Sequence, residues 1–217
     1  MKRKKLWILA GILWAAFALF TLLLTCVDVQ PVGPQGSSVG FATVNGWVLQ
    51  PLGVHLLWYH ITDWLGVVAI AFAFGFAVVG LCQLVMRKSL RKVDGHILVL
   101  GGFYLLVITC YLFFEQVVIN HRPVLMDGSL EASFPSSHTM IVVSIMATAA
   151  MEFRALCPRK RGWCLTVDII AAAVIAITVI GRLISGVHWF TDIAGGLLLS
   201  AALVALYCAG VAWIEKQ

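Results

Sequence analysis

Residues 122–138, RPVLMDGSLEASFPSSH, form a polar stretch between two long apolar blocks of the chain. A loop with these side chains, held between apolar helices, is where a functional site is expected. A second polar group lies downstream in residues 181–192, GRLISGVHWFTD, which contain Arg182, His188 and Asp192. We therefore expect the rest of the chain to be a frame that brings these two stretches together.

The composition identifies that frame as membrane-embedded. The chain has 217 residues, of which 61% are hydrophobic and only 12% are charged, whereas soluble domains carry about 25% charged residues. The net charge of +5 does not indicate nucleic-acid binding, because the charges lie at the ends of apolar blocks. The six cysteines include no C-x-x-C pair, so we interpret them as buried apolar residues or reduced thiols.

Six apolar stretches are each long enough to span a bilayer, which takes ~20 helical residues. They predict an all-α membrane protein, a single domain over residues 1–217 built as a six-transmembrane-helix bundle, with a first helix that is retained. Residues 28–60, rich in Gly, Pro and Trp, predict an interfacial helix or re-entrant element on the outer side. The predicted spans are residues 6–27, 61–86, 96–119, 139–153, 165–185 and 190–213.

The basic residues predict the orientation of the bundle. If the first helix has its basic end inside, 13 of the 15 lysines and arginines lie on the cytoplasmic side, which places both termini there. The two exceptions are Arg122 and Arg182, which fall at the outer face. The thirteen are Lys2, Arg3, Lys4, Lys5, Arg87, Lys88, Arg91, Lys92, Arg154, Arg159, Lys160, Arg161 and Lys216.

The two outer arginines, which have no fixed acidic partner in their own segments, suit a multiply charged anion. A guanidinium presents forked donors that match phosphate oxygens, and it stays charged near neutral pH. Ser136 and Ser137 add donors directly before the fourth predicted span, whose N-terminus favours an anion as well. We therefore predict a phosphate-binding site at the outer face.

The histidines predict the chemistry at that site. Asp192 follows His188 by four residues, so a helix starting near the histidine would let the two side chains form a hydrogen bond. A carboxylate on one imidazole nitrogen makes the other a better nucleophile or base. His138 has no such partner nearby in sequence and is free to donate a proton. The pattern predicts phosphoryl transfer, with one histidine as the nucleophile and the other as the acid, and with no cofactor and no metal.

Other interpretations of the same residues exist. Two histidines and an aspartate could form a zinc site with an open position, although two neighbouring arginines would repel the cation. Arg182 and Asp192 could be an intramembrane ion pair, and a single membrane histidine is more often a packing residue. The spacing and sidedness of the whole set favour the phosphate site.

At these residues the sequence resembles the type 2 phosphatidic acid phosphatase superfamily, the integral-membrane lipid phosphatases. That family has three motifs, K-x6-RP, PSGH and SR-x5-H-x3-D. The corresponding residues here are Glu115-x6-Arg122-Pro123, Pro135-Ser136-Ser137-His138 and Gly181-Arg182-x5-His188-x3-Asp192.

The resemblance implies roles for these residues. His188 would form a phosphohistidine, oriented by Asp192, and His138 would protonate the leaving group. The phosphoryl oxygens would be held by Arg122, Arg182 and Ser136.

Three positions depart from the family pattern. Glu115 replaces the first-motif lysine, Ser137 replaces the glycine of the second motif, and Gly181 replaces the serine of the third. Glu115 removes a phosphate contact, and it could turn outward or bind a positively charged substrate group.

The leading functional hypothesis is a lipid phosphate or diphosphate phosphatase in the plasma membrane, with its site facing outside. Candidate substrates are undecaprenyl diphosphate, phosphatidic acid and phosphatidylglycerophosphate. The short loops and basic inner side are typical of a bacterial protein of the cell envelope. The alternatives are a lipid-to-lipid phosphotransferase and a non-catalytic lipid-phosphate binder or transporter.

Overall fold

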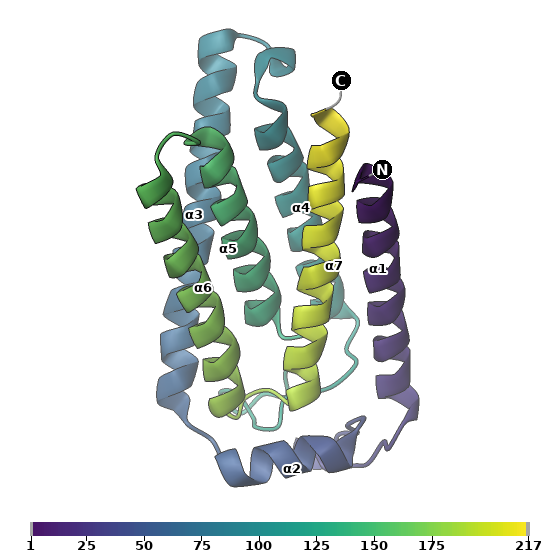
Figure 1. Ribbon diagram of the computed structural model, residues 1–217. Coiled ribbons are helices and arrows are strands. Elements are labelled where there is room, and N and C mark those ends of the chain that lie inside the picture. Colours follow the sequence, from purple (N-terminus) through teal and green to yellow (C-terminus); the bar gives the residue numbers. More distant parts are fainter. Residues whose placement is uncertain (1, 216–217) are drawn as a thin grey trace.

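Six long apolar helices run roughly along one direction in the computed structural model, which describes residues 2–215 (Figure 1). A shorter helix, α2, lies across one end of this bundle. The β-structure among the described residues is limited to isolated β-bridges. This confirms the expected all-α, six-span architecture. The elements are α1 (Lys2–Cys26), η1 (Pro34–Gly36), α2 (Ala42–Leu52), α3 (Leu56–Arg87), η2 (Leu90–Lys92), α4 (Gly95–Gln116), α5 (Ser137–Leu156), α6 (Arg161–Ile184) and α7 (Phe190–Ile214).

The predicted spans match these helices with shifts of a few residues at most ends. The largest shift is at α3, which starts at Leu56, so the final residues of the predicted segment 28–60 belong to a span. Helix α5 starts two residues earlier than expected, at Ser137, because the Ser136 hydroxyl caps it by accepting a bond from the Thr139 N–H (3.5 Å).

Two ends of the bundle can be distinguished. The N- and C-terminal ends lie at the same end as the α3–α4 and α5–α6 connections, and α2 lies at the opposite end with the α4–α5 and α6–α7 connections (Figure 1). The described basic residues that were predicted to be cytoplasmic thus lie at one end of the bundle. Lys216, counted with them, lies outside the described residues.

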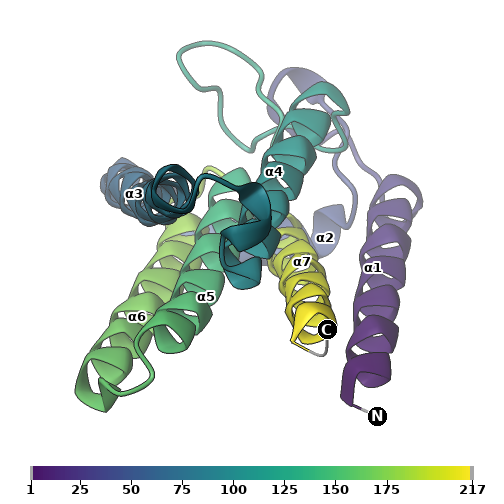
Figure 2. The same cartoon turned by 90° about the horizontal axis from the view of Figure 1, so that it is seen from above.

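Helices α5 and α7 occupy the middle of the bundle. Viewed along the bundle, α3 and α6 lie on one side and α1 on the other (Figure 2). Large apolar side chains remain exposed on the outer faces of the helices, among them Ile70 and Phe74 on α3 and Leu105 on α4. Such faces are stable in a hydrocarbon environment and would be unfavourable in water.

Helix α2 is fixed to the start of α7 by a buried asparagine. The side-chain amide of Asn45 donates to the Thr191 hydroxyl (2.9 Å) and accepts from the Thr191 backbone N–H (3.1 Å). The same amide donates to the Gly40 carbonyl (2.9 Å). Helix α2 therefore packs directly behind the turn that carries His188.

Phe134 anchors the polar α4–α5 loop in the apolar core. Its ring is fully buried and stacks on Phe17 with the ring centroids 6.1 Å apart, and it meets Phe114 edge-on at 6.2 Å. Aromatic pairs in these geometries add about 0.5–1.5 kcal/mol each beyond the burial of their area. The loop residues on either side of Phe134 are thereby held at a fixed depth.

Gly195 on α7 leaves the space that the Phe134 ring occupies. A Cβ at this position would overlap the ring, so we expect Gly195→Ala to displace Phe134 and to destabilise the protein by about 1–3 kcal/mol. The measurement is the melting temperature in detergent. Gly75→Ala on α3, where an added Cβ meets nothing within 4 Å, should leave it unchanged or slightly raised. Equal melting temperatures for both variants would contradict the anchoring role of Phe134.

Candidate active site

The α4–α5 loop folds into a short hairpin. His121 pairs with Ala132, and Met126 pairs with Ser129 around the tip. The tip residues Asp127 and Gly128 both have positive φ, 48° and 77°, which suits Asp-Gly in a tight hairpin turn. The predicted polar loop is thus an ordered element with two facing strands of chain.

The hairpin places an acid beside the first arginine. The Arg122 backbone N–H donates to the Glu131 carbonyl (3.0 Å), and the Arg122 Nε lies 3.0 Å from the Glu131 carboxylate. The expectation that Arg122 lacks an acidic partner in its own segment is therefore wrong, because hairpin pairing brings residues nine positions apart face to face. Arg122 is buried and Glu131 is exposed.

The second arginine is completely buried and pairs with an acid from α3. The Arg182 Nη2 donates to the Asp63 carboxylate, and the Arg182 guanidinium lies over the Tyr59 ring, 4.8 Å from its centroid. The alternative of an Arg182–Asp192 ion pair is not what forms. Gly181 is explained by the same packing, since a Cβ there would lie 2.6 Å from the Thr62 side chain. A serine in its place would require the Thr62 or Trp58 side chain on α3 to shift.

His138 also has an acidic partner that its sequence neighbourhood does not show. Its Nε2 lies 3.0 Å from the Asp63 carboxylate, while its Nδ1 is buried without a hydrogen-bond partner among the described residues. The sequence near His138 contains no such partner, as expected, but α3 supplies one from 75 positions away. Asp63 thus joins His138 and Arg182 through one carboxylate.

His188 and Asp192 are adjacent, but they do not form the expected hydrogen bond. The His188 Nδ1 lies 3.6 Å from the Asp192 Oδ2, which instead accepts from the Trp189 backbone N–H (2.9 Å). The reason is that α7 starts at Phe190, so His188 lies before the helix and the i, i+4 spacing is not helical. Asp192 caps its own helix, and its carboxylate lies next to the imidazole without bonding to it.

The two serines differ in their roles. Ser136 is buried, and its backbone N–H donates to the Asp192 carbonyl (3.0 Å), which joins the start of α5 to the start of α7. Ser137 is half-buried and lines a pocket together with His188. The predicted donors at the start of α5 therefore lie beside the histidine.

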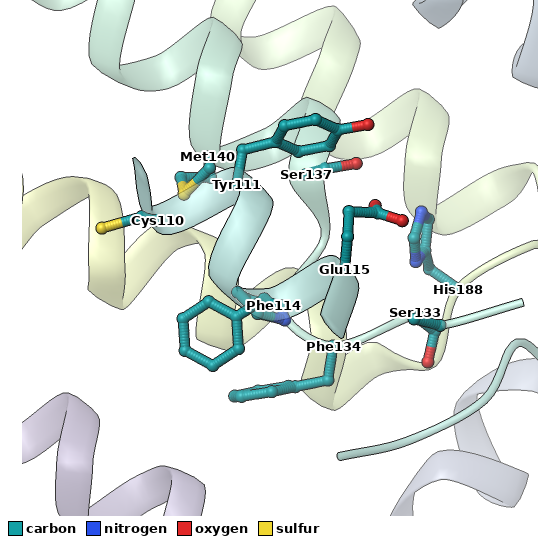
Figure 3. A pocket seen from close by; sticks show the side chains of 11 residues that line it. Cys110, Tyr111, Phe114, Glu115, Ser133, Phe134, Ser137, Met140 and His188 are labelled. Atoms are coloured by element: carbon teal, nitrogen blue, oxygen red, sulfur yellow. The ribbon is translucent and has the colours of Figure 1, made fainter. Parts of the chain in front are cut away.

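A narrow pocket opens beside His188. Glu115 projects into it from the last turn of α4, on the side where His188 lies, and Ser133 and Ser137 line it from the loop and from α5 (Figure 3). Glu115 is exposed and forms no ion pair among the described residues. It thus faces the site, as the first-motif position should, but with the opposite charge.

The surroundings of His188 favour its neutral form. The side chain is almost fully buried, in the turn between α6 and α7. Burial lowers the pKa of His188 well below its usual 6.5, and the positive charges of Arg122 and Arg182 lower it further. A neutral imidazole keeps an unshared lone pair on one ring nitrogen, which is chemically able to act as a nucleophile.

Asp63 is the site residue that the motifs do not contain. It is the lone acid of the span predicted over residues 61–86, and an ionisable residue inside a span is itself a signal of function. That signal was available, but its partners come from helices far along the chain. Within the described residues, no three His, Cys, Asp or Glu side chains gather in a way that could hold a metal ion.

A six-span bundle with two arginines and two histidines gathered at one end has the architecture of a multi-pass membrane phosphatase. Residues 102–215, more than half of the chain, match the PAP2 superfamily model. The chain belongs to the PAP2 superfamily, as the motifs indicated.

The fold is similar to the crystal structure of a transmembrane PAP2-type phosphatidylglycerolphosphate phosphatase from Bacillus subtilis. The two chains are 20% identical, the TM-score is 0.62, and the match covers 96% of each chain. No curated protein sequence gives a significant match.

The lowered pKa of His188 predicts acid sensitivity. The unfolded state takes up a proton near the usual pKa of 6.5, whereas the folded state does not, so stability is lost as pH falls below 6.5. We expect His188→Gln to flatten the decline in melting temperature between about pH 7.5 and about pH 5.5. His60→Gln, at an exposed histidine on α3, is the control and should keep the wild-type slope. An unchanged slope in His188→Gln would contradict the neutral, buried imidazole.

Proposed function

We propose that this membrane phosphatase hydrolyses a lipid phosphomonoester or lipid diphosphate at the outer leaflet, through a phosphohistidine on His188 and without a metal ion. The observation that carries the proposal is the buried His188 at the end of the bundle that also holds Arg122 and Arg182, where burial and the charges of the two arginines lower the pKa of the imidazole. Guanidiniums stabilise the charge that develops on a transferring phosphoryl group.

The proposed reaction has two steps. The His188 Nε2, which is the nitrogen not facing Asp192, attacks phosphorus, and the bond from phosphorus to the leaving oxygen breaks. His138 gives its proton to that oxygen. Water then attacks the phosphohistidine, the P–N bond breaks, the proton of the water goes to His138, and inorganic phosphate leaves.

The charge distribution supports the outward orientation. Arg87, Arg91 and Arg154 lie near the helix ends opposite the site, at the end of the bundle that carries the termini. Basic loops are retained on the cytoplasmic side, so the phosphate site would face outside. In this orientation the proposed reaction would take place at the headgroup level of the outer leaflet of a plasma membrane.

The substrate proposal covers undecaprenyl diphosphate, phosphatidic acid and phosphatidylglycerophosphate. All three present a terminal phosphate on a lipid anchor, which matches a site at the end of a membrane bundle. The similar fold of a phosphatidylglycerolphosphate phosphatase supports including the last of these.

The test is phosphate release from each of these lipids by the purified protein in detergent with EDTA present. We expect release with at least one lipid and its loss, by at least about a thousandfold, in His188→Ala, because the nucleophile is removed. The variant His60→Ala should remain active.

Other outcomes would contradict the proposal in distinct ways. Activity that disappears with EDTA and returns with a divalent metal would contradict the metal-free mechanism. Phosphate that moves to a second lipid without release would indicate a phosphotransferase. Binding of lipid phosphate without any turnover by folded wild-type protein would indicate a binder or transporter.

Glu115 should limit the affinity for anionic substrates. Its carboxylate lines the same pocket as His188, so it repels a phosphate there. We expect Glu115→Lys to lower the KM for phosphatidic acid by about threefold to tenfold, with Glu115→Gln in between, and salt should weaken the effect. A higher KM in Glu115→Lys would show instead that the carboxylate binds a positive group of the natural substrate.

A further inference from the structure

Asp63 contacts the two residues whose proposed roles require a free side chain. Its Oδ1 accepts from the Arg182 Nη2 and lies 3.0 Å from the His138 Nε2. Under the proposed function, Arg182 must hold a phosphoryl oxygen and His138 must face the leaving oxygen. One oxygen of Asp63 therefore occupies the positions that a phosphoryl oxygen would take at Arg182 and that the leaving oxygen would take at His138.

The burial of Arg182 explains why an acid is needed there without substrate. The Arg182 side chain has 0% exposure, and its Nε and Nη1 have no hydrogen-bond partner among the described residues. A buried charge without a counter-charge is strongly destabilising. Asp63 supplies that counter-charge from α3, and a phosphate dianion would supply a larger one.

The Asp63 side chain has room to move away from Arg182 and His138. Its side chain is 34% exposed, in contrast to the buried arginine. Helix α3 approaches His138 closely one turn later, where a Cβ on Gly66 would lie 3.1 Å from the imidazole. Rotation of the Asp63 side chain can therefore break both contacts while the helix stays in place.

We propose that Asp63 is an internal competitor of the substrate phosphate. In the substrate-free enzyme it occupies the donors of Arg182 and His138, and the incoming phosphoryl group displaces it. This inference rests on the proposed function for the role of the displaced contacts. Asp63 is not a catalytic residue in this proposal, because it acts by occupying Arg182 and His138 and does not touch the substrate itself.

The isosteric variant Asp63→Asn removes the competing charge. We expect inorganic phosphate and orthovanadate to bind it at least about fivefold more tightly than wild type, as measured by calorimetry on purified protein in detergent. The KM for the best lipid should fall by a similar factor, while kcat should change by less than about threefold, because the displaced state is the same.

Stability provides a second readout that does not depend on turnover. Without anion, Arg182 is unpaired in Asp63→Asn, so the melting temperature should fall, and phosphate should raise it by more than in wild type. The same melt can be recorded in native membranes if the variant does not survive purification. A residue needed only for structure would lower the melting temperature without increasing the response to phosphate.

Asp168→Asn is the matched control. Asp168 also pairs with an arginine, accepting from the Arg154 Nη2 at 2.5 Å, but it lies on α6 next to α5, at the opposite end of the bundle from the site. Its loss should leave phosphate affinity unchanged. Asp63→Glu, which keeps the charge, should bind phosphate within about twofold of wild type.

Weaker phosphate binding in Asp63→Asn would overturn the proposal, because it would show that Asp63 holds Arg182 in place for the substrate. Unchanged binding would overturn it too. Failure of the wild type to hydrolyse any lipid would count against the proposed function, whereas the calorimetry and melting measurements would still test the competition.

Discussion

A positive charge buried among membrane helices is the constraint on which this site depends. Arg182 is fully enclosed between α3, α6 and their neighbours, and its charge is compensated by Asp63 and by the face of Tyr59. The energy of an unpaired guanidinium in such a place is high. The buried guanidinium therefore needs an anionic partner. In this structure that partner is Asp63, and under the proposed function a phosphoryl group would replace it.

Other contacts in the bundle hold the segments around this site at one depth. Phe134 fixes the polar hairpin to the core from one side, and Asn45 ties α2 to the start of α7 from the other. The Trp189 indole N–H donates to the His121 carbonyl (2.7 Å), which joins the hairpin to the turn of His188. These contacts are far apart in sequence, so the site is rigid only when the whole fold is formed.

The sequence was sufficient to predict the spans, the shared end of the polar stretches and the motif residues. Hydropathy and charge asymmetry are properties of single segments, and they do not depend on packing. The partners of the charged residues could not be predicted in this way, because Asp63 meets Arg182 across 119 positions. The hydrogen bond predicted from the His188–Asp192 spacing does not form for a local reason. Helix α7 starts two residues after His188, so the pair does not have helical geometry.

The base and the tip of the hairpin between α4 and α5 are constrained differently. Its base is closed by the Arg122–Glu131 and Ser133–Asn120 backbone bonds, and its tip at Asp127 and Gly128 lies away from these closures. Residues can be added to the tip in pairs without a change of register. A longer tip would therefore extend beyond the paired base, while the bonds at the base keep Arg122 and Ser133 at the same depth.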